Sequence, residues 1–300
     1  MNRLIQWIAK LSDKSFQSFQ AVRIEDGGIK ERFYLKKSEH QIEFSQAHAV
    51  VSHAPFCLAV AMSPEQCLHF EKGSSEAFIL IGDQLCARLE VSAVNKIEQG
   101  SSHILIFRVD KADNFQINFI RQAFLFRLLK TKNSRFEDRC YAAAFSYPRS
   151  VIVVSFRHGD YYNIFPMDFQ CFLDAQGFYI LGLRVTNVTL HKMLAVRKVV
   201  VGDTSDVSRD TLYALGKHHS THPPLLNELP FKTTDSERFG FPVPDFSASY
   251  REIELVAEYR AGTHVVMIGK VVNVVKRREQ QSPIHHIHFF HALVSAYISA

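Results

Sequence analysis

The chain has 300 residues and a formal net charge of +5, with 22% charged and 47% hydrophobic residues. This composition is typical of a folded globular protein and excludes long disordered segments. The small net charge also argues against a basic module that binds nucleic acid. The length suits two domains better than one.

Cysteine usage and hydropathy indicate a protein of the cytoplasm. The five cysteines are odd in number and contain no C-x-x-C pair, which argues against a disulfide framework and a zinc ribbon. Charged side chains interrupt the first twenty residues, so they do not form the apolar core of a signal peptide. No run approaches the roughly 18 apolar residues that a membrane span needs. The densest basic run, Lys276-Arg277-Arg278, is predicted to be a solvated turn.

Residues 1–140 are predicted to form an α+β domain. Apolar residues at helical spacing over 4–11 indicate an amphipathic helix, and 114–132 show the same period. Between them, short apolar runs separated by polar or glycine-containing turns predict strands at 49–51, 56–61, 77–81, 86–91 and 104–109. The charged stretch 130–139 is predicted to be a linker with a boundary near 132–142, and the second domain is placed at 141–300. No motif in the first half indicates a function.

The second half begins with a predicted β-hairpin. Its strands are Val151–Phe156 and Tyr161–Ile164, joined by a turn at Gly159. Pro166 is expected to end the ladder, because proline has no N–H to donate. Further elements are predicted as strands at 178–183, 250–259 and 265–275 and helices at 190–196 and 210–216.

The start of the predicted helix at 190–196 is the most informative corner. Thr186 or Thr189 is expected to be its N-cap, which places hydroxyls beside unpaired backbone N–H groups. This geometry suits a phosphate group. Capping and phosphate binding use the same geometry, so both roles stay open.

Four motifs in the second half carry a resemblance to a known family. They are YPRSVIVV from Tyr147, the N-x-x-P segment Asn163–Pro166, the Thr189-Leu190 corner, and Gly262-Thr263-His264 followed by Ile268–Val271. With these motifs, residues from about 145 to 300 resemble the flavin reductase-like family of FMN-binding split barrels. The resemblance implies a mainly β fold, with an antiparallel split β-barrel of Greek-key type over 141–300.

The resemblance also implies a set of flavin-binding residues. Asn163 and the backbone from Pro166 to Phe169 would face the ring edge or the ribityl chain. Thr186 and Thr189, with the N–H groups of the helix start, would hold the FMN phosphate, and Lys192 would add positive charge.

Two positions depart from the family pattern. The family commonly has Ser or Thr at Asp168 and a basic residue at Asn187. A carboxylate near a phosphate would cost about 1 kcal/mol or more, so Asp168 is expected to face the N3–H of the flavin ring instead. Arg184 would replace the missing basic group if it points into the cleft. His264 would lie at the flavin edge or simply close a turn.

Two other segments of the second half could contribute to a binding site. The resemblance implies that residues 239–246, in a proline-rich irregular stretch, help to cover the flavin or nicotinamide side, although a surface loop packed on itself explains them equally well. His285, His286, His288 and His291 invite a metal interpretation, but no cysteine or carboxylate cluster accompanies them, and no metal is expected.

The resemblance implies an oxidoreductase in which NAD(P)H binds transiently and passes hydride to bound FMN. The cofactor would carry the chemistry, so no catalytic side chain is obligatory. The alternative is a non-catalytic module that binds flavin, or has lost it, and serves in sensing or partner recruitment. A homodimer is expected, because 265–275 offers apolar residues on both faces of one strand.

Overall fold

The computed structural model describes residues 18–300, except 26, 101, 130, 174–176, 219 and 280–281. Strands make up 50% of it and helices 19%, which confirms the expected mainly β fold. Within these residues no helix has the length and apolar character to cross a bilayer. The helix predicted at 4–11 lies outside the described residues.

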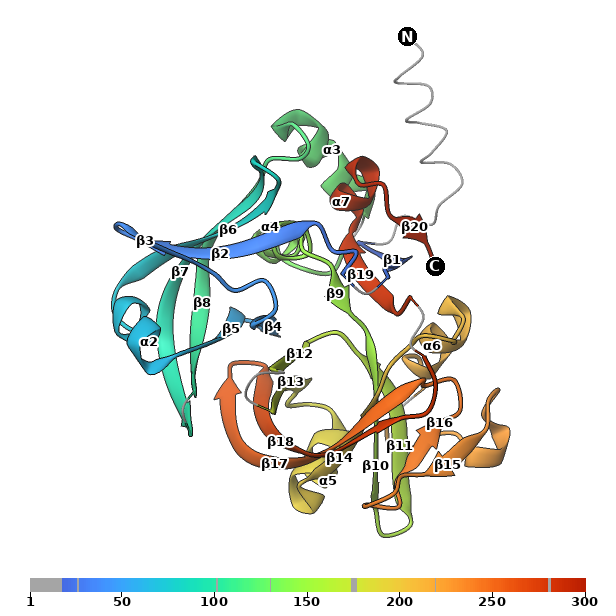
Figure 1. Cartoon of the computed structure of the whole chain (residues 1–300). Coiled ribbons are helices and arrows are strands. Elements are labelled where there is room, and N and C mark those ends of the chain that lie inside the picture. The colour runs from blue at the N-terminus through green and yellow to red at the C-terminus, as the bar shows by residue number, and fades with distance from the viewer. Residues whose placement is uncertain are drawn as a thin grey trace.

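The first half folds into a curled, antiparallel seven-stranded sheet with the order β3-β2-β6-β7-β8-β5-β4 (Figure 1). Its strands are β2 (Glu31–Lys37), β3 (His40–Glu43), β4 (His48–His53), β5 (Phe56–Met62), β6 (Ser74–Ile81), β7 (Gln84–Gln99) and β8 (Ser102–Asn114). Helix α2 (Pro64–Phe70) follows β5 and begins at a capping box formed by Ser63 and Gln66. All five predicted strands of this half are present within longer ones.

The second half forms another antiparallel seven-stranded sheet, with the order β11-β10-β14-β17-β18-β13-β12. Its strands are β10 (Ile152–His158), β11 (Tyr161–Met167), β12 (Gln170–Leu173), β13 (Phe178–Arg184), β14 (Lys198–Gly202), β17 (Ser249–Ala261) and β18 (His264–Lys276). Helix α5 (Val188–Val196) follows β13. Pro166 does not end the ladder: it lies opposite Val153 in β11, an edge strand where a missing N–H is tolerated.

The two sheets have the same connectivity. Each contains two successive hairpins, then a helix, a single strand and a long hairpin. When β2 is matched to β10 and each later strand to its counterpart, the spatial order of one sheet reproduces that of the other. No repeat can be aligned in the amino-acid sequence, so this internal correspondence is visible only in the structure.

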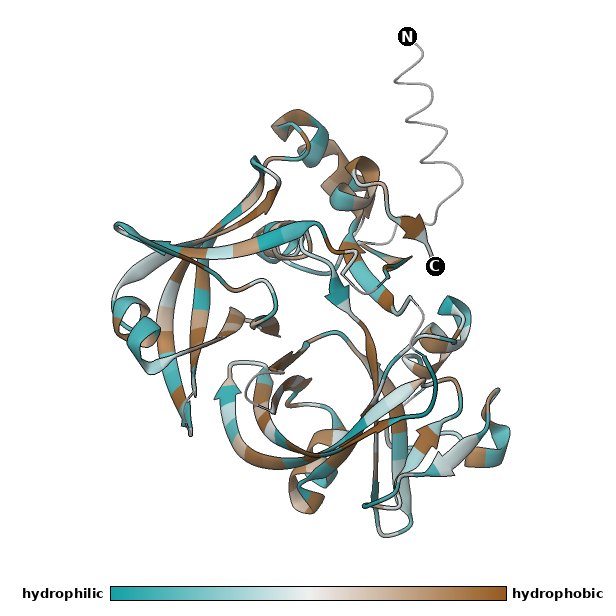
Figure 2. Cartoon of the chain, viewed as in Figure 1, coloured by the Kyte–Doolittle hydropathy of each residue, from teal (hydrophilic) through white to brown (hydrophobic). Residues whose placement is uncertain are grey.

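The sheets pack against each other through equivalent strands. Figure 2 shows hydrophobic residues on β4, β12 and β13 where the sheets meet. The shared apolar cluster consists of Ala49, Val51, Cys57, Ala59, Ala61, Ile104 and Ile106 from the first half, and Leu173, Ile180, Ala261, Val266 and Ile268 from the second. The backbones approach closely, because a Cβ on Gly182 would lie 2.7 Å from the carbonyl oxygen of Val51. The second apolar face of β18 is therefore covered within the chain.

Two helices connect the halves. Helix α3 (Phe119–Leu129) lies within the predicted helical stretch, although Phe119 and Ile120 are exposed. Helix α4 (Arg135–Ala144) starts at a capping box of Ser134 and Glu137 and packs on β7 and β8. The predicted linker is therefore wrong over 135–139, and the expected domain boundary at 140 falls inside this helix. Arg135 and Arg139 are exposed, whereas Asp138, Cys140 and the alanines after it are buried, and Asp138 accepts the hydroxyl of Thr131.

A small sheet joins the two ends of the chain. It has the order β20-β1-β19-β9, with β1 (Phe19–Arg23), β9 (Arg149–Ser150), β19 (Ile284–His288) and β20 (Ile298–Ser299) (Figure 1). Helix α7 (Phe289–Val294) places His291 so that its Nε2–H donates to Glu31 Oε1 at 2.8 Å. Burial opposes ionisation of Glu31, but hydrogen bonds from His291 and Tyr297 outweigh it and lower the pKa of Glu31.

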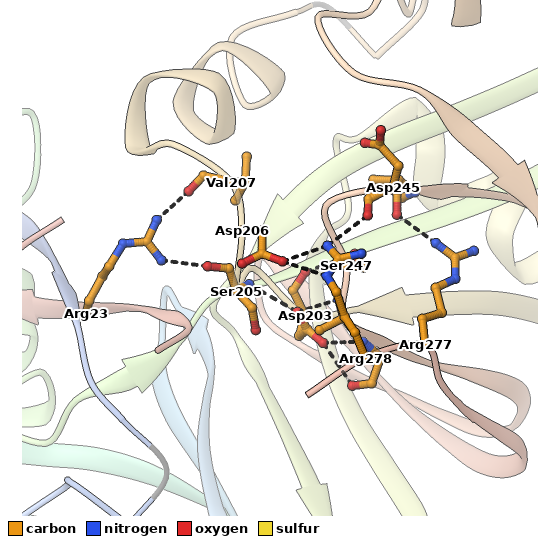
Figure 3. A network of polar contacts seen from close by, with 12 residues as sticks. Arg23, Asp203, Ser205, Asp206, Val207, Asp245, Ser247, Arg277 and Arg278 are labelled. Atoms are coloured by element: carbon orange, nitrogen blue, oxygen red, sulfur yellow. Dashed lines mark hydrogen bonds and ion pairs between the residues drawn. The ribbon is translucent and has the colours of Figure 1, made fainter. Parts of the chain in front are cut away.

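The remaining elements close one end of the second sheet. They are α6 (Arg209–Leu215), a 3-10 turn at Leu226–Glu228, and the hairpin of β15 (Thr233–Asp235) and β16 (Pro242–Pro244). A polar network fixes this end (Figure 3). In it Asp203 accepts the backbone N–H groups of Ser205, Ala248 and Ser249.

The basic run at 276–278 belongs to the same network. Arg278 donates to Asp206 Oδ2 at 2.7 Å and to the carbonyl of Asp245 at 2.9 Å, and Arg277 donates to the carbonyl of Pro244 (Figure 3). Lys276 pairs with Glu279. Arg277 and Arg278 hold loops of their own chain together. Lys276 is the last residue of strand β18 and not part of a turn, unlike the sequence expectation.

Gly182→Ala tests the close approach of the two sheets. The added Cβ would collide with backbone atoms of Val51, which cannot rotate away, so we expect a loss of about 2 kcal/mol in the free energy of unfolding. Gly216→Ala is the matched control: its nearest new contact is 3.4 Å and its φ is −76°, so its effect should stay below about 1 kcal/mol. Equal stability of the two variants in urea denaturation would contradict the close approach.

Candidate functional site

A pocket of about 270 Å³ lies between the two halves of the chain. The second half supplies the connection from β11 to β12, the end of β13, the start of α5 and the start of β18. The first half supplies Phe19 from β1, His53 from the end of β4 and Tyr141 from α4. Five of the nine residues predicted from sequence line this pocket: Pro166, Asp168, Phe169, Arg184 and His264.

Aromatic rings make up much of the pocket wall. The ring centroids of Phe169 and His264 are 5.3 Å apart, and those of His53 and His264 are 4.8 Å apart. Phe19 and Tyr141 pack edge to face with centroids 5.2 Å apart. Such a wall offers flat, weakly polar surface to a planar ligand.

The two histidines of the wall are held neutral. Burial lowers the pKa of His264 to about 3, and the nearby His53 and Arg184 act in the same direction. Burial and Arg184 also lower the pKa of His53. Neutral His264 is 3% exposed, and its Nδ1 lies 3.1 Å from the hydroxyl of Thr263. The charged side chains of the pocket are therefore Arg184 and Asp168.

Asp168 is oriented by a partner that the sequence interpretation missed. Its Oδ2 accepts the Nδ1–H of His286 at 2.8 Å, and the Tyr213 hydroxyl lies 3.2 Å from Nε2 of the same ring. The other oxygen, Oδ1, has no hydrogen-bond partner in the part of the chain that the structure describes. Asp168 therefore keeps one acceptor atom for a ligand. Because 118 residues separate Asp168 from His286, no local pattern could have joined them.

The helix corner differs from the sequence expectation. The N-cap of α5 is Asn187, whose side chain accepts the N–H of Thr189 at 3.0 Å, so neither threonine is the cap. Thr189 is 0% exposed, and its hydroxyl accepts from the Asn163 amide at 2.8 Å and lies 3.1 Å from the Tyr161 hydroxyl. This hydroxyl therefore points into the protein.

Four predicted site residues lie outside the pocket lining. Asn163 and Thr189 belong to a buried network in which the Asn163 carbonyl oxygen is 2.8 Å from Nε2 of His218. The Lys192 ammonium lies 4.3 Å from the centre of the Tyr161 ring, and Thr186 is exposed. Asn163 and Thr189 instead fix β11 and α5, the two elements that shape one side of the pocket.

The segment 239–246 does not line this pocket. The expectation that it covers the flavin or nicotinamide side is therefore wrong for this pocket. Phe241 and Val243 are buried in the core of the second sheet, and Phe246 packs edge to face on Phe231. The aromatic residues of the segment complete the core at the far end of the sheet instead.

The histidines near the C-terminus have separate roles. His285 Nδ1 lies 3.1 Å from the carbonyl of Pro283, and His288 accepts the N–H of Phe290 as the cap of α7. Over the described residues, no group of three or more histidine, cysteine, aspartate and glutamate side chains is placed to hold a metal ion.

Part of this fold is similar to that of solved flavin-binding proteins. No protein-family model and no curated protein sequence matches the chain. An NADH:FAD oxidoreductase of Streptomyces globisporus is similar over 52% of this chain and 92% of its own, at 12% identity and a TM-score of 0.45. The flavin reductase PheA2 is similar over 53% and 94%, at 16% identity and a TM-score of 0.41.

An FMN-binding protein of Thermus thermophilus with bound 1-cyclohex-2-enone is similar over 44% of this chain and 72% of its own, at 20% identity and a TM-score of 0.39. The likeness is to the fold of about half of this chain, and identities are low. We therefore build the functional proposal on the sequence motifs and the pocket geometry.

Buried neutral histidines make the fold sensitive to acid. Burial lowers the pKa of His264, His285 and His288 to about 3, 4 and 3. The unfolded chain takes up protons near pH 6.5 that the folded chain does not, so the free energy of unfolding should fall as the pH drops from about 6.5 towards 4, by up to ~1.4 kcal/mol per pH unit for each histidine. Urea denaturation across this range measures the slope. His264→Gln removes one of these histidines, so the slope of the free energy of unfolding against pH should fall by the contribution of one proton. An unchanged slope would contradict the conclusion that His264 is buried in its neutral form.

Proposed function

We propose that the pocket between the two halves binds FMN and that the protein is an NAD(P)H-dependent oxidoreductase similar to flavin reductases. One observation carries the proposal. Pro166 and His264, which come from two family motifs far apart in the sequence, line a single aromatic-walled pocket together with Asp168 and Arg184. In the same proposal each seven-stranded sheet is a split barrel.

The residues of the pocket fit the parts of FMN. The aromatic side chains and the neutral imidazoles suit a planar ring, and the free Oδ1 of Asp168 suits its N3–H donor. At about 270 Å³ the pocket is near the lower end of the ~300–1,000 Å³ of small-molecule sites, so it suits the ring system better than the whole nucleotide. The ribityl phosphate would extend out of it. When bound, the flavin supplies the electron transfer between NAD(P)H and an acceptor.

Arg184 is the proposed phosphate partner. It is exposed at the end of β13 and lines the pocket beside Asn187, where the nine-residue helix α5 begins. A guanidinium and a helix N-terminus both favour an anion. Thr189 does not offer its hydroxyl, because Asn163 and Tyr161 already engage it. In this proposal Lys192 contributes at most positive charge to the surroundings, and Thr186 contributes no charge.

One chain completes the pocket in this proposal. A homodimer was expected because β18 is apolar on both faces, but the first half covers the second face through Val51, Ala59 and Ile106. The same half contributes Phe19, His53 and Tyr141 to the pocket wall. The first half therefore takes the place that the sequence interpretation gave to a second copy.

A second candidate function is a non-catalytic flavin-binding module. The observation that favours it is the inward orientation of the Thr189 hydroxyl, which leaves Arg184 as the cation of the pocket and Asp168 as a nearby negative charge. Weak retention of the phosphate would suit a sensor that responds to flavin concentration. Flavin binding and turnover are therefore tested separately.

Arg184→Ala should weaken FMN binding roughly ten- to hundredfold, because it removes a charge-assisted contact to the phosphate. Riboflavin has the same ring and ribityl chain without the phosphate, so its affinity should change much less. Flavin fluorescence titration measures both. Arg209→Ala, at an exposed arginine of α6 paired with Asp210, is the matched control and should leave both affinities unchanged.

Thr189→Ala separates scaffold from phosphate ligand in the same titration. Loss of its interior hydrogen bonds should lower stability by about 1 kcal/mol or more without favouring riboflavin over FMN. Equal losses of FMN and riboflavin affinity in Arg184→Ala would show that Arg184 does not bind the phosphate. A loss of FMN affinity without an equal loss of riboflavin affinity in Thr189→Ala would show instead that Thr189 binds the phosphate.

Turnover distinguishes the two candidate functions. The intact protein with added FMN should oxidise NADH or NADPH faster than FMN alone, followed as loss of nicotinamide absorbance. Tyr141→Leu, which alters the wall supplied by the first half, should reduce that rate. Tight flavin binding without any acceleration would support the binding module and contradict the oxidoreductase.

A further inference from the structure

A second cavity between the two halves, of about 360 Å³, shares no lining residue with the first pocket. It lies where the starts of β4 and β12 meet, and these strands occupy equivalent places in the two sheets. His48 comes from β4 and Gln170 from β12, while Arg149 belongs to β9 in the connection between the halves. Sites at such junctions commonly hold small ligands.

Arg149 is a buried cation without a counter-ion. It is 4% exposed and forms no ion pair with any residue that the structure describes. Its terminal nitrogens donate to the carbonyls of His48 and Ala144, both at a long 3.3 Å, and its Nε–H has no partner. Burial lowers the pKa of Arg149 to about 10. A buried charge without a partner is costly, so this position favours the arrival of an anion.

A second arginine faces the same cavity with unused donor capacity. The Arg251 guanidinium lies 4.1 Å from the centre of the Phe172 ring, and its Nε–H also has no partner. It too forms no ion pair within the described ranges. Asp203 is the carboxylate among the lining residues, but it already accepts from Ser205, Ala248 and Ser249. Two guanidinium groups and one carboxylate leave the lining with one more positive than negative charge.

The other polar side chains of the cavity are neutral. His48 donates through Nδ1 to the carbonyl of Phe44 at 2.8 Å, which leaves Nε2 as a buried acceptor without a partner. Burial and the charge of Arg149 keep the pKa of His48 well below its usual value. Burial also lowers the pKa of His285 to about 4 and raises that of the Cys171 thiol to about 12. The cavity thus combines two cations, one carboxylate that is already hydrogen-bonded, and one unused acceptor.

We propose that this cavity binds a small organic acid whose carboxylate or phosphate oxygens pair with Arg149 and Arg251 and whose hydroxyl donates to Nε2 of His48. Guanidinium groups match the oxygens of both anions in geometry. The volume equals that of about twelve water molecules at ~30 Å³ each, which is more than one inorganic ion fills. Because β4, β9 and β12 all contribute, the bound acid also holds the two halves together.

Binding to the folded chain alone should raise its melting temperature. We would compare malate, glycerol 3-phosphate, inorganic phosphate and chloride at equal ionic strength, with the intact protein. Malate or glycerol 3-phosphate should raise the melting temperature in a saturable way, and chloride should not. A larger rise in melting temperature with malate than with glycerol 3-phosphate would indicate a site for carboxylates. The reverse order would indicate a site for phosphate esters. Calorimetric titration of the better ligand then gives its affinity.

Arg251→Gln is the main variant, because Arg251 is half-buried on β17 and its loss leaves the carbonyl contacts of Arg149 in place. It should weaken the better ligand roughly ten- to hundredfold. Arg260→Gln, at an exposed arginine on the same strand, is the matched control and should bind as the parent does. Arg149→Met should abolish binding where it folds.

Two results would overturn the proposal. One is the absence of any saturable stabilisation by malate or glycerol 3-phosphate beyond that by chloride. The other is an unchanged affinity in Arg251→Gln, which would place the anion elsewhere even if Arg149→Met failed to fold. Neither result depends on flavin, so this test is independent of the proposed oxidoreductase function.

Discussion

The contact between the two seven-stranded sheets determines the rest of this structure. Small and β-branched residues of β4, β5 and β8 pack against β12, β13 and β18, and Gly182 permits the backbones to approach where any Cβ would collide with Val51. Hydrogen bonds reinforce the contact: the Ser52 hydroxyl donates to the carbonyl of Ala261, and the Thr263 N–H donates to that of Ala54. The matching connectivity of the sheets makes this an interface between equivalent surfaces, as in a two-fold dimer built from one chain.

Both candidate sites depend on that contact. The aromatic-walled pocket needs Tyr141 and His53 from one half and Arg184 from the other, and the cationic cavity needs His48 from one half and Arg251 from the other. A change that shifts the sheets relative to each other would therefore alter both sites at once. Their chemistry differs, because aromatic rings and neutral imidazoles dominate the first pocket, while the second has two guanidinium groups that form no ion pair within the described residues.

The local sequence pattern predicted most helices and strands, but it could not predict contacts between residues far apart in the sequence. Alternation and β-branched residues located β10, β13 and β18, and the Gly262-Thr263-His264 motif placed His264 at the pocket. The capping box at Ser134 was readable, but the charged residues around it suggested a linker instead of helix α4. The link from Asp168 to His286 and the inward turn of Thr189 depend on tertiary packing, which sequence spacing does not encode. The matching connectivity of the two halves was likewise not predicted, because no repeat can be aligned in the amino-acid sequence.

The central claim is that one chain, through both of its halves, builds one flavin pocket. The most direct test is the stoichiometry of FMN on the purified protein, from flavin absorbance and light scattering across the same gel-filtration peak after saturation with FMN. The account predicts one FMN for each 34.3 kDa chain. A protein that retains no flavin at saturation, or one FMN shared by two chains, would contradict it.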